Sequence, residues 1–255
     1  EKRIRELRGV DTKYSKSLKS FASRLRWHCH FMQKLEDQPN IETKALHSSF
    51  ENLRPSFSDH KILNSWENGT TGYPMIDACM RYLNSTGWLN FRMRAMLVSF
   101  ASYHLWLDWR QTASHLARQF LDYEPGIHYS QIQMQSGTTG MNSIRIYNPI
   151  KQGMDQDPDG KFIRKWVPEL KNIPNQFIHQ PWLLGDSSLN YPKPIVDEKI
   201  ARTAAQEKVY HLKKRIKNSA ETVSLVQKHA SRLKRRPRKN LRSSKSVKKQ
   251  LNFDL

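Results

Sequence analysis

Two arginines and two carboxylic acids on neighbouring segments are the residues of this sequence whose types and spacing could do chemistry. Arg92 and Arg94 lie in a segment that is apolar on most sides, and Asp122 and Glu124 follow within residues 121–126. A buried guanidinium keeps its charge and therefore needs a carboxylate or another anion as its partner. Two interpretations are open: a structural salt bridge, or a pair that lines a pocket for a polar, planar ligand.

The segment that must position these side chains is expected to form two helices and a long loop. Thr71 would cap the first helix, Pro74 would lie in its first turn, and Gly87 would end it in the left-handed conformation. The second helix is expected from about residue 88 to 113, and because it is apolar nearly all round it should be buried. Residues 122–148 are rich in amides and small side chains, and we expect a functional loop there.

The rest of the chain also favours helices. Glycine is scarce, with 10 in 255 residues, and no run alternates between polar and apolar residues as a strand does. We therefore predict an all-α, multi-helical protein with long loops. Further helices are expected at residues 14–38, 59–66, 111–121, 161–168 and 200–217.

The positive charge is concentrated near the C-terminus. The net charge is +20, and residues 199–255 carry 18 Lys or Arg against three acidic residues, a net +15. We predict a helical domain over residues 1–215 and a basic tail over 216–255 that is disordered in isolation. The tail could simply aid solubility, but we favour a non-specific nucleic-acid arm, because clustered cations bind phosphates.

The cysteine count and the hydropathy restrict the compartment. Cys29 and Cys79 allow no disulfide framework and no four-cysteine iron–sulfur cluster within this chain, which fits a reducing compartment. His28 and His30 flank Cys29 but point to different sides of a helix, so we expect no metal site. The sequence has no membrane-spanning stretch, so we expect a soluble protein in the cytoplasm, the nucleoid or the nucleus. We also expect it to be a monomer.

Several motifs together resemble the flavin-binding domain of the photolyase/cryptochrome family. They are Thr-Gly-Tyr-Pro at 71–74 with Asp-Ala at 77–78, Asp-Trp-Arg at 108–110, Arg-Ile-Tyr-Asn-Pro at 145–149 and the stretch 160–170. Their order and spacing agree over about residues 20–215. The resemblance implies FAD as cofactor. The family's N-terminal antenna domain, which can hold an antenna pigment, and its flavin-phosphate loop precede this point. They are not found in this sequence, so we expect a fragment.

The resemblance also implies cofactor-binding residues. Arg94 and Asp122 match the family's arginine–aspartate pair beside the isoalloxazine ring, and Glu124 matches a second acidic contact. His128 falls where the family places Asn or Asp facing flavin N5, where it could donate a hydrogen bond or a proton. We also expect Trp88 to contact the cofactor.

For electron transfer, we expect two catalytic tryptophans, Trp109 and Trp106, of which the resemblance implies the first. Trp109 matches the middle member of the family's chain of three tryptophans. The inner position falls on Ile132 and the outer one near Phe57, and neither residue relays electrons well. Trp106 could belong to another path, although core packing is an equally good interpretation of these tryptophans.

On the DNA side, Trp27 matches the tryptophan that flanks the flipped-out lesion, and Arg24 replaces the family's lesion-binding glutamate. Phe91 replaces a lesion-contacting asparagine. The implied DNA-binding positions are Trp27, Arg24, Arg92, Gln152 and Met134, the last at the position of the second base-stacking tryptophan.

The resemblance therefore implies blue-light-driven repair of pyrimidine dimers in UV-damaged duplex DNA. The damaged pair would be flipped out of the duplex, and reduced flavin would donate an electron to it. Two alternatives stay open: a cryptochrome-like flavin photoreceptor without repair activity, and a DNA-binding remnant without cofactor.

Overall fold

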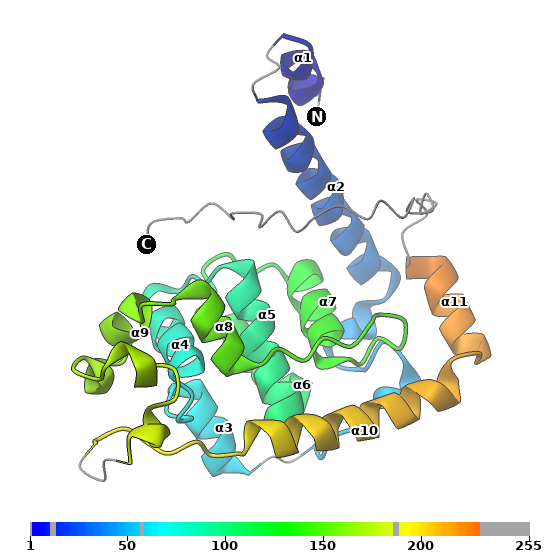
Figure 1. Ribbon diagram of the computed structural model, residues 1–255. Coiled ribbons are helices and arrows are strands. Elements are labelled where there is room, and N and C mark those ends of the chain that lie inside the picture. Colours follow the sequence, from blue (N-terminus) through cyan, green and yellow to red (C-terminus); the bar gives the residue numbers. More distant parts are fainter. Residues whose placement is uncertain (1, 11–13, 57–58, 186–188, 230–255) are drawn as a thin grey trace, which may run out of the picture.

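A computed structural model describes residues 2–10, 14–56, 59–185 and 189–229, and it consists of helices joined by loops (Figure 1). These residues contain no strand, which agrees with the predicted all-α class. The α-helices are α1 (Lys2–Val10), α2 (Ser15–Asp37), α3 (His60–Glu67), α4 (Pro74–Thr86), α5 (Phe91–Ser99), α6 (Trp109–Gln119), α7 (Pro125–Ser136), α8 (Pro149–Gln156), α9 (Lys161–Trp166), α10 (Glu198–Ile216) and α11 (Ala220–His229).

Five 3-10 helices and one π-helix complete the described elements. The π-helix η3 (Phe100–His104) continues directly from α5. The 3-10 helices are η1 (Pro39–Glu42), η2 (Ser48–Phe50), η4 (Pro168–Leu170), η5 (Asn175–Phe177) and η6 (Pro181–Leu184).

Helix α4 is the central helix, and both of its expected ends can be checked. Pro74 occupies the first turn, and Gly87 ends the helix at φ 70°, as predicted. Thr71 is not the cap, because Tyr73 holds that position. The Thr71 hydroxyl instead donates to the buried carboxylate of Asp77 at 2.6 Å, so Thr71 fixes the loop before the helix.

The single helix expected over residues 88–113 is wrong. After α5 the chain widens into the π-helix η3, turns, and begins again as α6. Trp106 has a φ of 56°, which is rare for a residue with a side chain, and it marks the turn. The Asp108 carboxylate then caps α6 by accepting the Arg110 backbone N–H at 2.8 Å. The apolar composition continues through this break, so composition alone could not reveal it.

The loop expected over residues 122–148 is also wrong, because α7 occupies its first half. The Glu124 side chain caps α7, Pro125 lies in the first turn and Gly137 ends the helix at φ 78°. Two glutamines of α7 are buried, Gln135 at 4% exposure and Gln133 completely. The polar composition therefore indicated a loop, whereas the buried Gln133 amide in fact donates hydrogen bonds to backbone carbonyls inside the protein.

The main core surrounds α4, which packs against α8, α9 and α5. Its completely buried side chains include Trp66, Ile76, Met80, Leu83, Met96 and Leu97. Of the two free cysteines, Cys79 lies in this core and Cys29 is exposed on α2. Within the described residues, no helix is both long enough and apolar enough to cross a membrane.

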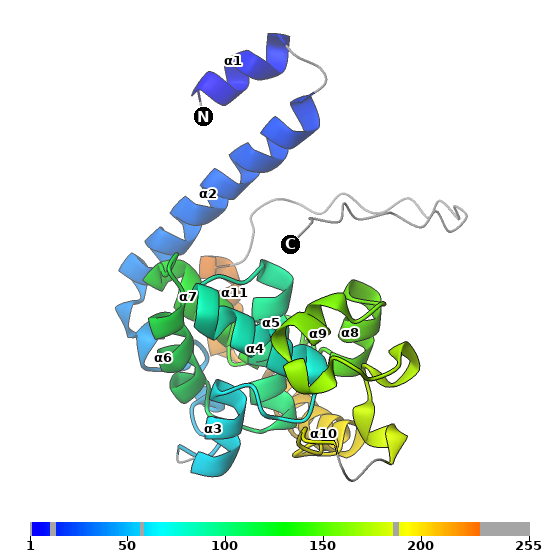
Figure 2. The ribbon, with the colours of Figure 1, turned by 90° about the vertical axis from the view of Figure 1, so that its left-hand side faces the viewer.

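Helix α2 projects from the body, with α1 folded against its outer end (Figures 1 and 2). Its inner end packs against α7. Gly126 permits this close approach, because a Cβ atom there would lie 2.8 Å from the Phe31 carbonyl oxygen.

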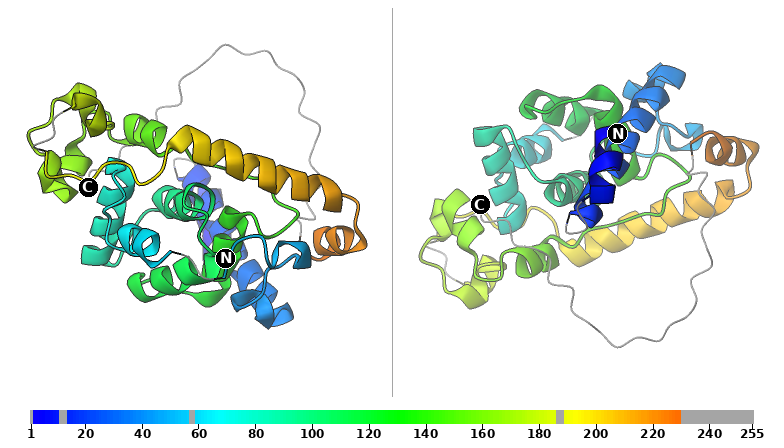
Figure 3. Two further views of the ribbon diagram at one scale, coloured as in Figure 1. Left: turned by 90° about the horizontal axis from the view of Figure 1, so that it is seen from below. Right: turned by 90° about the horizontal axis from the view of Figure 1, so that it is seen from above.

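Helix α10 runs along one face of the molecule, and α11 folds back at its end (Figure 3). Leu225 of α11 packs in a small core with Ile41 and Leu46, and the His229 ring lies 2.6 Å from the Gln38 side chain. Residues 220–229 are therefore folded onto the body, and the division of the chain at residue 216 stays a prediction. The basic runs at 234–239 and 245–249 lie outside the described residues.

Candidate functional site

The structure brings Arg94 and Asp122 together, as the sequence predicted. Arg94 Nη2 donates to both Asp122 oxygens, at 3.0 and 2.9 Å, and Arg94 Nε donates to the Leu89 carbonyl at 2.5 Å. The guanidinium also lies over the Phe120 ring, 4.0 Å from its centroid. These contacts hold the guanidinium in one orientation.

The expected burial of these charges is wrong. The Asp122 side chain is 53% exposed, Arg94 is half-buried at 23%, and Arg92 is exposed. An ion pair this open to water contributes only about 0–1 kcal/mol to stability. Stability alone is therefore a weak reason for the pair.

Beside this pair lies a hollow of about 550 Å³, solvent-open space included. It is enclosed by α5, one residue of α6, the connection 120–124 and the inward face of α7. The part of this space that atoms of a ligand could occupy is about 80 Å³, below the about 300–1,000 Å³ of typical small-molecule pockets, so the hollow takes the edge of a ligand rather than a whole one. The lining side chains include Phe91, Arg94, Val98, Leu116, Phe120, Asp122, Tyr123, Glu124, His128, Gln131, Ile132 and Gln135.

Two lining residues carry buried polar atoms that have no hydrogen-bond partner among the described residues. They are Oε2 of Glu124 and both amide atoms of Gln131. A buried polar group without a partner is costly, so such atoms usually indicate a ligand or ordered water. Apolar walls with a few unsatisfied donors and acceptors fit the edge of a flavin ring. Sequence reasoning missed Gln131, which shares a helix face with His128, Ile132 and Gln135 once residues 125–136 are known to be helical.

His128 lines the hollow and is neutral. Its Nε2 lies 2.9 Å from the Ala113 carbonyl oxygen, which can only accept, so Nε2 carries the proton. Burial lowers the pKa of His128 to about 4, with a smaller contribution from Arg94. The ring proton is therefore engaged within the protein, which argues against His128 as a proton donor to a ligand near neutral pH.

The tryptophans assigned to cofactor binding or electron transfer do not line this hollow. Trp109 is buried in α6, with the Arg110 guanidinium 4.7 Å from its ring centroid. Trp106 lies between Arg54 and Lys208, at 4.8 and 4.7 Å. Trp88 is 43% exposed. Their assigned roles stay predictions, and Phe57 lies outside the described residues.

The predicted DNA-binding residues come from four helices. Trp27 and Arg24 are exposed neighbours on α2, with the guanidinium 5.4 Å from the Trp27 ring centroid. Arg92 is exposed on α5, whereas Met134 on α7 and Gln152 on α8 are half-buried. Among these five residues, the Arg24–Trp27 contact is the one that the structure shows.

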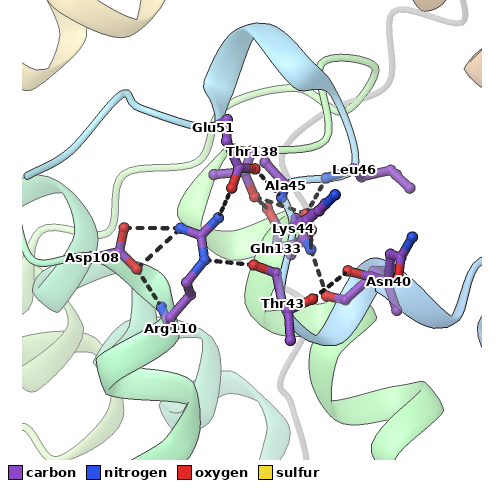
Figure 4. A network of polar contacts seen from close by, with 11 residues as sticks. Asn40, Thr43, Lys44, Ala45, Leu46, Glu51, Asp108, Arg110, Gln133 and Thr138 are labelled. Carbon is purple, nitrogen blue, oxygen red and sulfur yellow. Dashed lines mark hydrogen bonds and ion pairs between the residues drawn. The ribbon is translucent and has the colours of Figure 1, made fainter. Parts of the chain in front are cut away.

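A polar network holds the segment 39–51 against α6 and α7 (Figure 4). The Arg110 guanidinium donates to the Thr43 carbonyl at 2.6 Å, pairs with Asp108 at 3.1 Å and also pairs with Glu51. The Gln133 amide donates to two carbonyls of the same segment at 2.8 Å each. These contacts fix α7, and with it one wall of the hollow.

The fold and the hollow together define a helical cofactor-binding domain. Residues 21–211 match the family described as the FAD binding domain of DNA photolyase. The chain belongs to this family, which confirms the resemblance noted in the sequence and FAD as the cofactor.

Individual relatives agree with this assignment. The chain is 40% identical to the deoxyribodipyrimidine photo-lyase of Escherichia coli over 145 residues, 55% of this chain and 31% of that protein. It is 37% identical to a cryptochrome DASH of Synechocystis over 153 residues, 56% of this chain and 31% of that protein. The crystal structure of a Sulfolobus tokodaii photolyase with two FAD molecules superimposes with a TM-score of 0.71 at 30% identity, covering 82% of this chain and 47% of that one. The chain thus spans less than half of each of these relatives.

Proposed function

We propose that this chain is the flavin-binding part of a light-driven DNA repair protein of the deoxyribodipyrimidine photo-lyase type, acting as a monomer on UV-damaged duplex DNA. The observation that carries the proposal is the Arg94–Asp122 pair beside a hollow whose Glu124 and Gln131 side chains have unsatisfied polar atoms. Bound FAD would supply light-driven electron transfer to the damaged bases.

The residues of the hollow have separate tasks in this proposal. Asp122 and the Leu89 carbonyl orient Arg94, and no hydrogen bond within the described residues uses its Nη1. That nitrogen is therefore available to a carbonyl oxygen or ring nitrogen of the flavin. Glu124 and Gln131 supply further hydrogen bonds, and the apolar walls exclude water from the ring.

DNA would be held by charge and by stacking. Trp27 is 42% exposed, and an exposed aromatic ring can stack on an unpaired base, which contributes about 1–3 kcal/mol. Arg24 beside it and Arg92 on α5 would contact phosphates, which position the strand without reading its sequence.

A second candidate function is flavin-dependent light sensing without repair. Two observations favour it: Arg24 stands where the resemblance places a lesion-binding glutamate, and the half-buried Met134 provides no aromatic platform. One of the relatives is a cryptochrome, although its name gives no activity for this chain.

Flavin binding tests the shared part of both functions. We expect the chain, mixed with FAD, to become yellow, and Asp122→Ala to weaken binding at least about tenfold, or 1.4 kcal/mol. The matched control is Asp155→Ala, which removes an exposed ion pair with Lys151 on α8 and should leave binding unchanged. A colourless preparation would favour a DNA-binding remnant, and equal binding by Asp122→Ala would remove the pair from the site.

Repair is tested separately with an oligonucleotide that contains a thymine dimer. Reduced flavin-loaded protein under blue light should restore the thymine absorbance, and the same sample in the dark should not. Flavin binding without repair would favour the light-sensing function.

A further inference from the structure

A second hollow lies between 3-10 helix η2 and helix α10, and the proposed flavin function does not use it. One wall is formed by Ser48, Ser49 and Asn52, and the other by Lys208, His211 and Arg215. It is an open groove of about 1,130 Å³, solvent-open space included.

The basic wall of the groove is a stripe along one face of α10. Lys208, His211 and Arg215 are spaced i, i+3 and i+7, so their side chains follow one another along the helix. None of the three forms an ion pair with a carboxylate among the described residues. Lys208 instead lies over the Trp106 ring, 4.7 Å from its centroid.

The opposite wall already holds an anion at one end. The Glu221 carboxylate of α11 accepts the Ser48 backbone N–H at 2.7 Å and the Ser48 hydroxyl at 2.6 Å. A phosphate oxygen can accept the same two hydrogen bonds. This edge of the groove therefore suits an oxyanion next to a stripe of cations, and the Glu221 carboxylate occupies that place.

Among the described residues, the groove and the flavin hollow share no lining residue. The hollow is lined by α5, α6, the 120–124 connection and α7, whereas the groove lies between η2 and α10. A ligand in the groove would thus be separate from one at the flavin hollow.

We propose that this groove binds the phosphodiester backbone of a nucleic-acid strand. Its stripe of cations fits a row of phosphates, and its open shape fits an extended chain better than a single enclosed phosphate. Contacts of this kind do not depend on base sequence. They weaken as the salt concentration rises, because the release of condensed counterions from the nucleic acid then contributes less free energy.

Hydrogen–deuterium exchange of the full chain tests the site locally, with a twelve-nucleotide oligothymidylate as the probe. We expect the oligonucleotide to protect amides in peptides covering residues 46–54 and 206–216. The double variant Lys208→Glu/Arg215→Glu should lose this protection. The control Lys199→Glu/Lys214→Glu changes the net charge equally with residues that do not line the groove, and it should keep the protection.

Affinity gives a second measurement. In fluorescence anisotropy, the groove variant should make the slope of log K against log salt shallower by about 1.4. The variant loses two cations, and each phosphate contact to a single strand contributes about 0.7 to the slope. Glu221→Gln, which removes the competing negative charge, should tighten binding about twofold or more.

Two results would overturn the proposal. The first is an absence of protection in both peptides while other peptides respond to the oligonucleotide. The second is equal protection by inorganic phosphate at the same phosphate concentration, which would indicate a single-phosphate site. Neither measurement involves flavin or light, so a failure here is distinguishable from a failure of the repair function.

Discussion

The carboxylate of Asp77 is buried and accepts hydrogen bonds from four donors. These are the N–H and hydroxyl of Thr71 at 2.8 and 2.6 Å, the Gly72 N–H at 3.0 Å and the Tyr191 hydroxyl at 2.5 Å. This one side chain therefore joins the start of α4 to the distant segment around residue 191.

We expect Asp77→Ala to lower the free energy of unfolding by about 3–5 kcal/mol, because four buried donors lose their acceptor. Urea unfolding followed by circular dichroism measures this. Tyr191→Phe removes a single donor and should cost about 1 kcal/mol. A loss below 1 kcal/mol for Asp77→Ala would show that water replaces the carboxylate.

Burial lowers the pKa of six histidines among the described residues, so several of them make stability depend on pH, and His104 and His128 are two of these. Burial lowers the pKa of His104 and of His128 to about 4, with smaller contributions from Arg202 and Arg94. Because the unfolded histidines titrate near pH 6.5, the unfolded chain binds more protons than the folded protein below that pH. Their contribution is thus complete above pH 6.5 and is lost as the pH falls toward 4.

At pH 5 we expect each histidine to cost on the order of 2 kcal/mol relative to pH 7. Urea unfolding of flavin-free protein at the two pH values measures the difference. His128→Asn should reduce it, whereas the exposed His28→Asn should not. An unchanged difference in His128→Asn would place the pH dependence elsewhere.

At the scale of elements, the helices with strong end signals were predictable. The first turn and C-cap of α4 and the extent of α2, α3 and α10 agree with the sequence to within a few residues. Helix α7 was missed although Glu124, Pro125 and Gly137 mark its ends, because its polar face was taken as loop composition. Burial of Gln133 comes from contacts with a segment almost ninety residues away, which local sequence does not contain.

The pairing of α2 with α7 depends on Gly126. We expect Gly126→Ala to cost about 1–3 kcal/mol, because the new methyl group would meet the Phe31 backbone and the Met32 side chain. Urea unfolding measures the loss, and faster amide exchange in the inner half of α2 would locate it. The control Ser20→Ala, at an exposed position of α2, should change the free energy of unfolding by no more than about 0.5 kcal/mol. Unchanged exchange in α2 would mean that the two helices adjust without separating.

For the candidate site, the sequence predicted the partner of Arg94 but not the openness of the pair. Pairing follows from charge and from the matching motif, whereas exposure depends on how Phe120 and the 120–124 connection fold over the guanidinium. The unsatisfied Gln131 amide could not be predicted either, because it depends on the face that α7 turns inward.

At the scale of the whole molecule, charge is distributed unevenly. Residues 230–255, which lie outside the described residues, carry ten Lys or Arg and one Asp. We expect their deletion to make the slope of log K against log salt for duplex DNA shallower by several units, since each phosphate contact contributes about 0.9. Anisotropy titrations between about 50 and 200 mM salt measure this. An identical slope after deletion would assign DNA binding to the folded body alone.

The positions of the two cysteines have a practical consequence. Burial raises the pKa of the Cys79 thiol, so that side chain is shielded from reagents, whereas Cys29 is exposed two residues from Trp27 on the projecting helix. A maleimide dye would therefore attach at a single position without mutagenesis. Since residues two apart point to different sides of a helix, the dye would leave the indole face open while its fluorescence reports when a strand arrives there.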